Sequence, residues 1–156
     1  MSVDLQPMRW WHIEPVMQLE RTLFVDDAWT DTMFWSELAE PASRHYVVAL
    51  DDEQLVGYAG LCAYDAGESY VQTIAVSPER QGGGVGTVLL TDLLDEAARR
   101  GCSRVDLEVR DGNDEAIRLY EKHGFRRIGV RRGYYQPSGA DALVMRRDAT
   151  RGGATR

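Results

Sequence analysis

The sequence predicts an α/β (α+β) fold with a mixed, mostly antiparallel central sheet of about seven strands and about four helices. Three observations lead to this prediction. Three strand-like segments follow one another in the first half of the chain, joined by short polar turns. An apolar strand, a glycine-rich loop, a helix-period segment and an alternating strand then come in succession, the pattern of a parallel strand pair with a crossover. A last pair of strand-like segments closes the chain as a hairpin.

The N-terminal segment predicts an edge strand and two helices. Val3–Pro7 can form a short edge strand. Apolar residues recur at helical spacing over Trp11–Phe24, where Pro15 is tolerated because it falls in the first turn. Thr30 is a good N-cap for a second helix that ends near Ala39.

Three aromatic side chains gather at the joint between these two helices, at Trp29, Phe34 and Trp35. Large aromatic residues are mostly buried, so one interpretation places all three in the core. The other places some of them at the mouth of a substrate groove. The sequence leaves both open.

The next three segments predict antiparallel strands. Arg44–Leu50 and Leu55–Ala63 are separated by the polar run 51–54, which is typical of a hairpin, and the turn at 65–68 leads into Ser69–Val76. The strand Ser69–Val76 runs directly into the glycine-rich loop.

Four glycines crowd the start of the next helix, which carries apolar residues at i, i+4 spacing and ends before Gly101. A bare loop at a helix N-terminus directs unpaired N–H groups, with the positive end of the helix dipole, at one point. The sequence therefore predicts a seat for a phosphate or pyrophosphate. A glycine-rich turn that only caps the helix is the alternative.

Two common phosphate loops do not fit. A Walker loop needs Gly-Lys-Ser/Thr, but Gly86 is followed by Thr87 and the only lysine of the chain is Lys122. The dinucleotide fingerprint needs a third glycine at the position of Thr87. The pattern that remains is Gln81-x-x-Gly84-x-Gly86 with Arg80 before it.

The strand Arg104–Arg110 alternates strictly between apolar and charged residues, and it should run parallel to Ser69–Val76. Its charged face carries Arg104, Asp106, Glu108 and Arg110. Because strands beside a crossover usually have both faces covered, this face is expected to border a wet groove. Cross-strand ion pairs on an outer face are the alternative.

The last third of the chain predicts a helix and a hairpin. Asn113 is a good N-cap, and Gly124 and Phe125 suit a Schellman closure that folds Phe125 back on Tyr120. Tyr120 is otherwise read as a core aromatic with its hydroxyl at the surface. The segments 126–132 and 142–147 form the hairpin, and 148–156 is predicted to be a disordered tail.

Composition indicates one ordinary globular domain, 1–147, with 44% hydrophobic and 28% charged residues. The net charge of −7 argues against direct nucleic-acid binding and is compatible with a basic peptide partner. No apolar run is long enough for a membrane span, and Cys62 and Cys102 have no metal or redox spacing. We therefore expect a cytoplasmic protein with no metal, and a monomer is favoured.

Taken together, the motifs over about Leu5–Arg147 resemble the GNAT family of N-acetyltransferases, and within it the RimI type, which acetylates a ribosomal-protein alanine. The segments that carry the resemblance are the loop 80–86 with 74–76 before it, 107–110, Asn113 with 119–121, 124–125, 132–135 and 141–145. Ala28-Trp29-Thr30 matches a Pro-Trp-Ser of that type. Gly82 and Gly83 stand where the family usually has an arginine or another long side chain.

The resemblance implies the GNAT fold, with a splayed parallel strand pair at the acetyl-CoA site, and direct acetyl transfer to an N-terminal peptide of a ribosomal protein. It implies Glu108 as general base and Tyr120 as general acid, with Trp29, Tyr134 and Tyr135 toward the peptide. The residues it implies for acetyl-CoA are Ile74, Ala75, Val76, Arg80, Gln81, Gly82, Gly83, Gly84, Val85, Gly86, Thr87, Asn113 and Tyr120.

Two other functions remain open from the sequence. One is acetylation of a lysine side chain or a small-molecule amine. The other, from a different class, is a binding module that holds acetyl-CoA without transferring the acetyl group.

Overall fold

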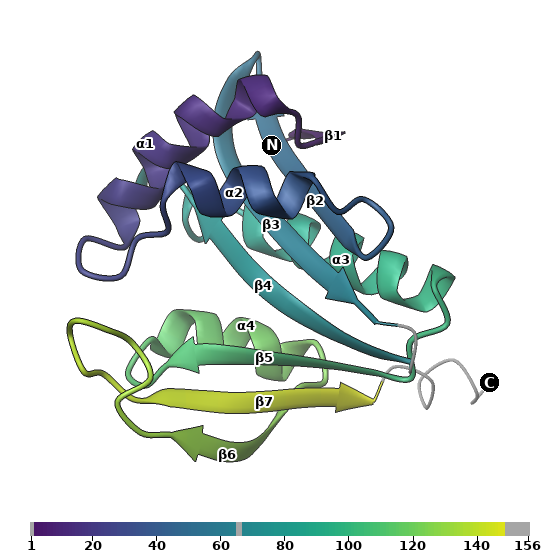
Figure 1. The fold of residues 1–156 in the computed structure, drawn as a ribbon, viewed down its shortest axis with the longest axis vertical. Helices are drawn as coiled ribbons and strands as arrows, with labels where there is room; N and C mark the ends of the chain where they lie inside the picture. The colour runs from purple at the N-terminus through teal and green to yellow at the C-terminus, as the bar shows by residue number, and fades with distance from the viewer. Residues whose placement is uncertain (1, 65–66, 149–156) are drawn as a thin grey trace.

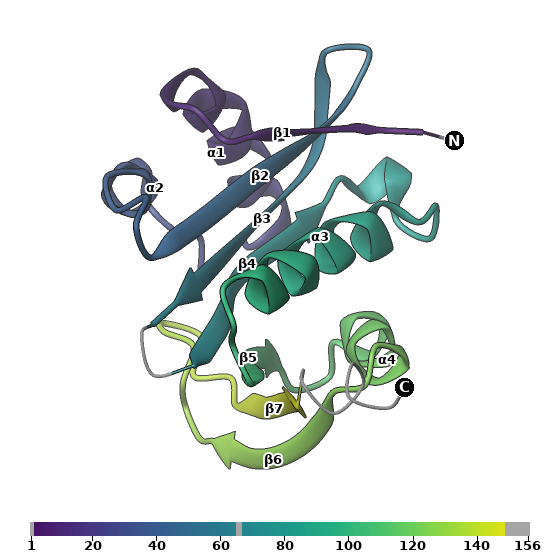
Figure 2. The same cartoon turned by 90° about the vertical axis from the view of Figure 1, so that its right-hand side faces the viewer.

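The structure is a computed structural model that describes residues 2–64 and 67–148. Seven strands form one sheet in the order β1-β2-β3-β4-β5-β7-β6, in which only the β4–β5 neighbours are parallel. Helices α1 and α2 cover one face of this sheet, and α3 and α4 cover the other (Figures 1 and 2). The predicted fold class is confirmed. The strands are β1 (Asp4–Pro7), β2 (Arg44–Asp51), β3 (Gln54–Ala63), β4 (Glu68–Val76), β5 (Arg104–Arg110), β6 (Arg126–Arg131) and β7 (Ala142–Asp148), and the helices are α1 (Ile13–Leu23), α2 (Asp31–Leu38), α3 (Val85–Arg99) and α4 (Asp114–Lys122).

The first helical segment begins as a 3₁₀ turn at Trp10–His12 before α1. Thr30 caps α2 as predicted, because its hydroxyl accepts the N–H of Met33 at 3.2 Å. The three aromatic residues between α1 and α2 do not share one environment, so each of the two interpretations holds in part. Phe34 is fully buried in the core, Trp35 is 49% exposed, and Trp29 is half-buried beside a cavity.

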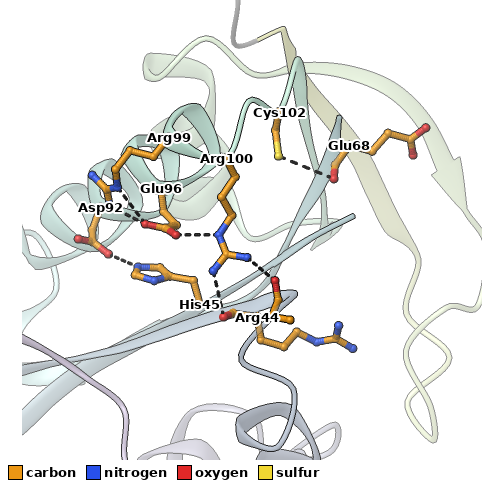
Figure 3. Close-up of polar contacts among 9 residues, drawn as sticks. Arg44, His45, Glu68, Asp92, Glu96, Arg99, Arg100 and Cys102 are labelled. Carbon is orange, nitrogen blue, oxygen red and sulfur yellow. Dashed lines mark hydrogen bonds and ion pairs between the residues drawn. The ribbon is translucent and has the colours of Figure 1, made fainter. Parts of the chain in front are cut away.

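The face that carries α3 is tied to β2 by a polar network at the C-terminal half of the helix (Figure 3). Arg100 bonds Glu96 on its own helix at 2.7 Å and the carbonyl oxygen of Ala42 at 2.9 Å. The ring of His45 on β2 lies 2.8 Å from the carboxylate of Asp92 on α3. These contacts fix α3 against the sheet, and so they fix where its N-terminus lies.

Strands β4 and β5 start together and then separate (Figure 1). Their pairing ends at Val71 and Leu107, although each strand continues beyond that point. The register of β4 on β3 slips at the same place, because Val71 pairs with Leu61 and Thr73 with Gly60, which leaves Gln72 as an extra residue. A bulge bends its strand and increases the local twist. The bulge therefore accounts for the opening between β4 and β5.

The C-terminal part follows the prediction closely. Asn113 caps α4, since its side-chain oxygen accepts the N–H of Ala116 at 3.3 Å. Gly124 has φ +91°, and the N–H of Phe125 bonds the carbonyl oxygen of Tyr120 at 3.0 Å, which completes the Schellman closure. The rings of Tyr120 and Phe125 meet edge to face at 5.8 Å. Strand β7 includes Asp148, one residue beyond the predicted end, and the rest of the predicted tail, 149–156, lies outside the described residues.

Candidate active site

The opening between β4 and β5 holds a cavity of about 900 Å³. Its walls come from parts of the chain that are far apart in the sequence: the loop after α1, the free part of β4, the glycine loop, the end of β5, helix α4 and the β6–β7 loop. The lining residues with a candidate role are Glu20, Asp27, Trp29, Ile74, Ala75, Val76, Gln81, Gly82, Gly84, Gly86, Thr87, Glu108, Arg110, Asn113, Tyr120 and Tyr135.

The N-terminus of α3 is built as an anion seat. Gly84 occupies its N-cap with φ +93°, a conformation that side-chain-bearing residues rarely adopt, and no side chain caps the helix. The first turn contains no acidic residue, in contrast to α4, which has Asp114 and Glu115. The first N–H groups of a helix have no acceptor within it, so those of α3 are available to a bound anion.

The loop before α3 is anchored by two of its polar side chains. Gln81 donates to the carbonyl oxygen of Val76 at 3.1 Å, and Arg80 forms an ion pair with Asp51 at 2.6 Å. Arg80, Gly83 and Val85 do not line the cavity, and the side chain of Val85 is buried in the core. The structure therefore gives Arg80 a partner at the end of β2 that the sequence did not suggest.

The free edge of β4 supplies main-chain groups to the cavity. Ile74, Ala75 and Val76 pair with β3 on one side, and their other edge faces the opening, beyond the last β4–β5 pair. An unpaired strand edge presents alternating N–H and C=O groups to any extended chain beside it. This edge suits a ligand with amide groups along its length.

Each of the two interpretations of the charged face of β5, ion pairs or a wet groove, holds for some of its residues. Asp106 is buried and bonds Arg146 on β7 through both carboxylate oxygens, at 2.8 and 3.0 Å. Glu108 and Arg110 line the cavity instead. The carboxylate of Glu108 is 3.3 Å from the guanidinium of Arg131 on β6.

Tyr120 projects from α4 into the same cavity and is 5% exposed. Burial, and secondarily the nearby Tyr135, raise the pKa of its hydroxyl. The hydroxyl carries its proton throughout the neutral range, as an ordinary tyrosine does, and because it lines the cavity Tyr120 can act as a proton donor there.

Glu108 and Tyr120 reach the cavity from opposite faces of the sheet. Val105, Leu107 and Val109 on β5 pack in the cluster that contains α3 and Tyr120. Because side chains alternate along a strand, Glu108 and Arg110 lie on the other face, where α1 and α2 are packed. The anion seat and Tyr120 are therefore on one side of the opening, and Glu108 is on the other.

Three further predicted site residues differ in whether they line the cavity. Asn113 lines the cavity while its oxygen caps α4. Tyr135 lines the cavity, and burial raises its pKa to about 12. Tyr134 lies outside the lining, 47% exposed, with the guanidinium of Arg131 5.8 Å from its ring centre.

Glu20 is a cavity residue that the sequence analysis did not identify. It is 2% exposed, accepts a hydrogen bond from the hydroxyl of Tyr58 on β3, and accepts the N–H of Trp29 at 2.9 Å. It thereby ties the α1–α2 loop to the sheet. The signal in the sequence was an acidic residue within the apolar stripe of α1, beside Val16 and Met17 in helical spacing.

Replacing Glu20 with alanine is expected to lower the free energy of unfolding by about 2–4 kcal/mol, because the buried hydroxyl of Tyr58 and the partly buried N–H of Trp29 lose their acceptor. Urea unfolding of wild type and Glu20→Ala would measure the difference. Glu20→Gln is the matched control, since its amide oxygen can still accept the N–H of Trp29 and most of the stability should remain. An alanine variant as stable as wild type would contradict this role.

The stability of the same glutamine variant, relative to wild type, should depend on pH. Burial raises the pKa of the Glu20 carboxyl. A carboxyl with a raised folded-state pKa stabilises the fold below its ordinary value of about 4.5, and this contribution is lost as the pH rises through the folded value. The stability of Glu20→Gln relative to wild type should therefore increase from pH 4.5 to neutral pH.

Among the described residues, no group of three or more His, Cys, Asp and Glu side chains is placed to hold a metal ion. Within the same part of the chain, every helix is too short or too polar to cross a bilayer.

Comparison with known proteins agrees with this geometry. The model of the acetyltransferase (GNAT) family matches residues 9–125. The chain belongs to this family. It is 49% identical over 136 residues to the N-alpha-acetyltransferase RimI of Mycobacterium tuberculosis, a match that covers 85% of this chain and 84% of that protein.

Two solved structures extend the likeness to the whole GNAT fold. The ribosomal-protein-S18-alanine N-acetyltransferase of Escherichia coli superposes with a TM-score of 0.82 at 28% identity, covering 94% of this chain and 93% of that one. Ard1 of Thermoplasma volcanium gives a TM-score of 0.86 at 28% identity, covering 94% and 97%. The resemblance inferred from the sequence motifs is confirmed.

Proposed function

We propose that this chain is an N-alpha-acetyltransferase that transfers an acetyl group from acetyl-CoA to the N-terminal alanine of a small-subunit ribosomal protein. The observation that carries the proposal is the cavity through the sheet, with an anion seat and Tyr120 on one face and Glu108 on the other. The identity to the Mycobacterium tuberculosis enzyme supports an N-terminal amine as acceptor. The name of the Escherichia coli structural relative supports ribosomal protein S18 as the class of substrate.

The chemistry of acetyl-CoA fits the cavity. Its diphosphate matches the uncapped N-terminus of α3, where Gly82, Gly84, Gly86 and Thr87 line the wall. The amide groups of its pantetheine arm match the free edge of β4 at 74–76, and Asn113, which also lines the cavity, would contact the same arm. With Gly82 and Gly83 in the loop, main-chain groups carry the diphosphate contact.

The reaction is a direct transfer. The neutral amine nitrogen attacks the thioester carbonyl carbon, and Glu108 takes the proton that the amine gives up, directly or through a water. The carbon–sulfur bond then breaks, and Tyr120 gives its proton to the departing thiolate. The amine approaches from the α1/α2 face, because that face holds Glu108.

An α-amine is an easier nucleophile for this site than a lysine. Its pKa is about 7.7–8.0, compared with about 10.4 for lysine, so deprotonation costs roughly 3 kcal/mol less. A single partly solvated carboxylate is an adequate base for an α-amine and a poor base for a lysine side chain. This difference favours the N-terminal reaction over lysine or polyamine acetylation.

Such an enzyme would work in the cytoplasm, where ribosomal proteins are made. We propose that it acts as a monomer of one domain, residues 1–147, and that it makes no direct contact with nucleic acid. Size-exclusion chromatography with light scattering would measure its mass and so its oligomeric state.

The test is acetyl transfer by the purified chain to three kinds of amine. We expect release of CoA with a peptide that begins with a free alanine, and little with the same peptide N-terminally blocked and carrying a lysine, or with a polyamine. Equal kcat/KM for the lysine peptide would favour the side-chain reaction. Binding of acetyl-CoA with no CoA release for any amine would identify a binding module.

A further inference from the structure

A polar bridge crosses the open end of the cavity on the α1/α2 face. Asp27, in the loop between α1 and α2, forms an ion pair with Arg110 at the end of β5. Ser138, in the β6–β7 loop, donates to the Asp27 carboxylate at 3.3 Å and receives a hydrogen bond from Arg110 at 3.4 Å. The guanidinium of Arg110 also lies over the ring of Tyr135, 5.1 Å from its centre. Three segments far apart in the sequence thus meet at one point.

The bridge lies on the amine side of the cavity. Asp27, Arg110 and Tyr135 all line it, and Arg110 shares its face of β5 with Glu108. The anion seat at the N-terminus of α3 is on the other face. Figure 1 shows the α1–α2 loop and the β6–β7 loop facing each other across the side where β4 and β5 have separated. The bridge is therefore the point at which these two loops are held together.

The pair is sheltered enough to hold its geometry. The side chain of Asp27 is 10% exposed and that of Arg110 is 39% exposed. Fully exposed ion pairs contribute little to stability. Here the carboxylate is sheltered and accepts a second hydrogen bond, and the cation also packs on an aromatic ring, so the contacts form a network. Losing the Asp27 charge would weaken both links between the loops, and losing the Arg110 charge would leave only the hydrogen bond from Ser138 to Asp27.

We propose that Asp27 and Arg110 are positioning residues that join the α1–α2 and β6–β7 loops into one wall of the peptide port and thereby set the affinity for the acceptor peptide. This inference rests on the proposed function, because it assumes a peptide amine as acceptor. A loop that is ordered in advance loses less conformational entropy when a ligand binds. With the bridge broken, the peptide must order both loops itself, whereas acetyl-CoA, which binds on the other face, need not.

The test is a double-mutant cycle with Asp27→Asn, Arg110→Gln and the double variant. We expect each single substitution to raise the KM for an alanine-started peptide about 5- to 10-fold, with kcat and the KM for acetyl-CoA within about 2-fold of wild type. Because the two side chains act through one contact, the double variant should be little worse than the worse single one. Arg110→Gln should have the larger effect, since it also removes the contact with Tyr135.

Arg126→Gln is the matched control, because Arg126 pairs with Asp148 at 2.9 Å at the far end of the β6–β7 hairpin and does not line the cavity. It should leave the peptide KM unchanged. If Arg110→Gln does not fold, Ser138→Ala replaces it in the cycle, because it removes the hydrogen bonds that Ser138 donates to Asp27 and accepts from Arg110; it should raise the peptide KM by a smaller factor.

Three results would overturn the inference: an unchanged peptide KM, an equal rise in the KM for acetyl-CoA, or effects of the two substitutions that multiply. Failure of the proposed function has a different signature, because the wild-type chain itself would then release no CoA with the alanine peptide. The two failures are therefore distinguishable in one set of assays.

Discussion

Glu108→Gln should reduce kcat for an alanine-started peptide about 100-fold or more at pH 7, the effect of removing a general base. The amide has almost the same size as the carboxylate and can still accept a hydrogen bond from Arg131, which is 3.3 Å away in the wild type. What it cannot do is take a proton. Steady-state kinetics with the peptide varied at saturating acetyl-CoA would measure kcat directly.

The defect of Glu108→Gln should shrink as the pH rises. The α-amine of the peptide has a pKa of about 7.7–8.0, so above pH 8 most of it is already neutral and depends less on a base. The ratio of wild-type to variant kcat is therefore expected to fall between pH 7 and pH 9.

Glu121→Gln is a suitable control for the loss of a carboxylate. Glu121 is on the exposed side of α4, 4.0 Å from Arg127, and does not line the cavity. Its substitution should leave kcat near the wild-type value. If Glu108→Gln were within a few-fold of wild type as well, Glu108 would not be the base.

The elements of this fold that depend on local sequence could be predicted from it. The alternation of Arg104–Arg110 predicted β5 with its correct bounds, and the strand–helix–strand order predicted its parallel partner. Asn113 and Gly124 predicted the start and the end of α4, because capping and a positive φ are local requirements. The glycine loop predicted the helix that follows it for the same reason.

The features that shape the cavity were not predictable, because they depend on contacts between distant segments. The bulge at Gln72 is a slip of register between β3 and β4, which no property of β4 alone reveals. The alternation of β5 could not show that Asp106 would be paired with Arg146 while Glu108 stayed at the cavity. The partners of Arg80 and Asp27 lie 29 and 83 residues away along the chain, at Asp51 and Arg110.

Tyr120→Phe should reduce kcat about 10- to 100-fold, since it removes a proton donor without removing the ring. The thiolate of CoA has to leave with a proton, and a thiol of this kind has a pKa near 8.5, so an unassisted thiolate is a poorer leaving group than the protonated thiol. Burial raises the pKa of the Tyr120 hydroxyl, which makes it a weaker acid, so the transfer depends on the negative charge that develops on the sulfur. The KM for acetyl-CoA should change little, because the hydroxyl is needed mainly in the transition state.

The fold should tolerate this substitution, which separates catalysis from structure. The ring of Tyr120 packs edge to face on Phe125 at 5.8 Å, and a phenylalanine ring can keep this contact. The free energy of unfolding is thus expected to stay within about 1 kcal/mol of wild type. Tyr64→Phe, at an exposed tyrosine that follows β3 and lies outside the cavity lining, should leave both kcat and stability unchanged. A Tyr120→Phe variant with wild-type kcat would show that the departing thiolate takes its proton from elsewhere. A variant whose kcat falls only because the protein unfolds would show that Tyr120 is a core residue without a role in proton transfer.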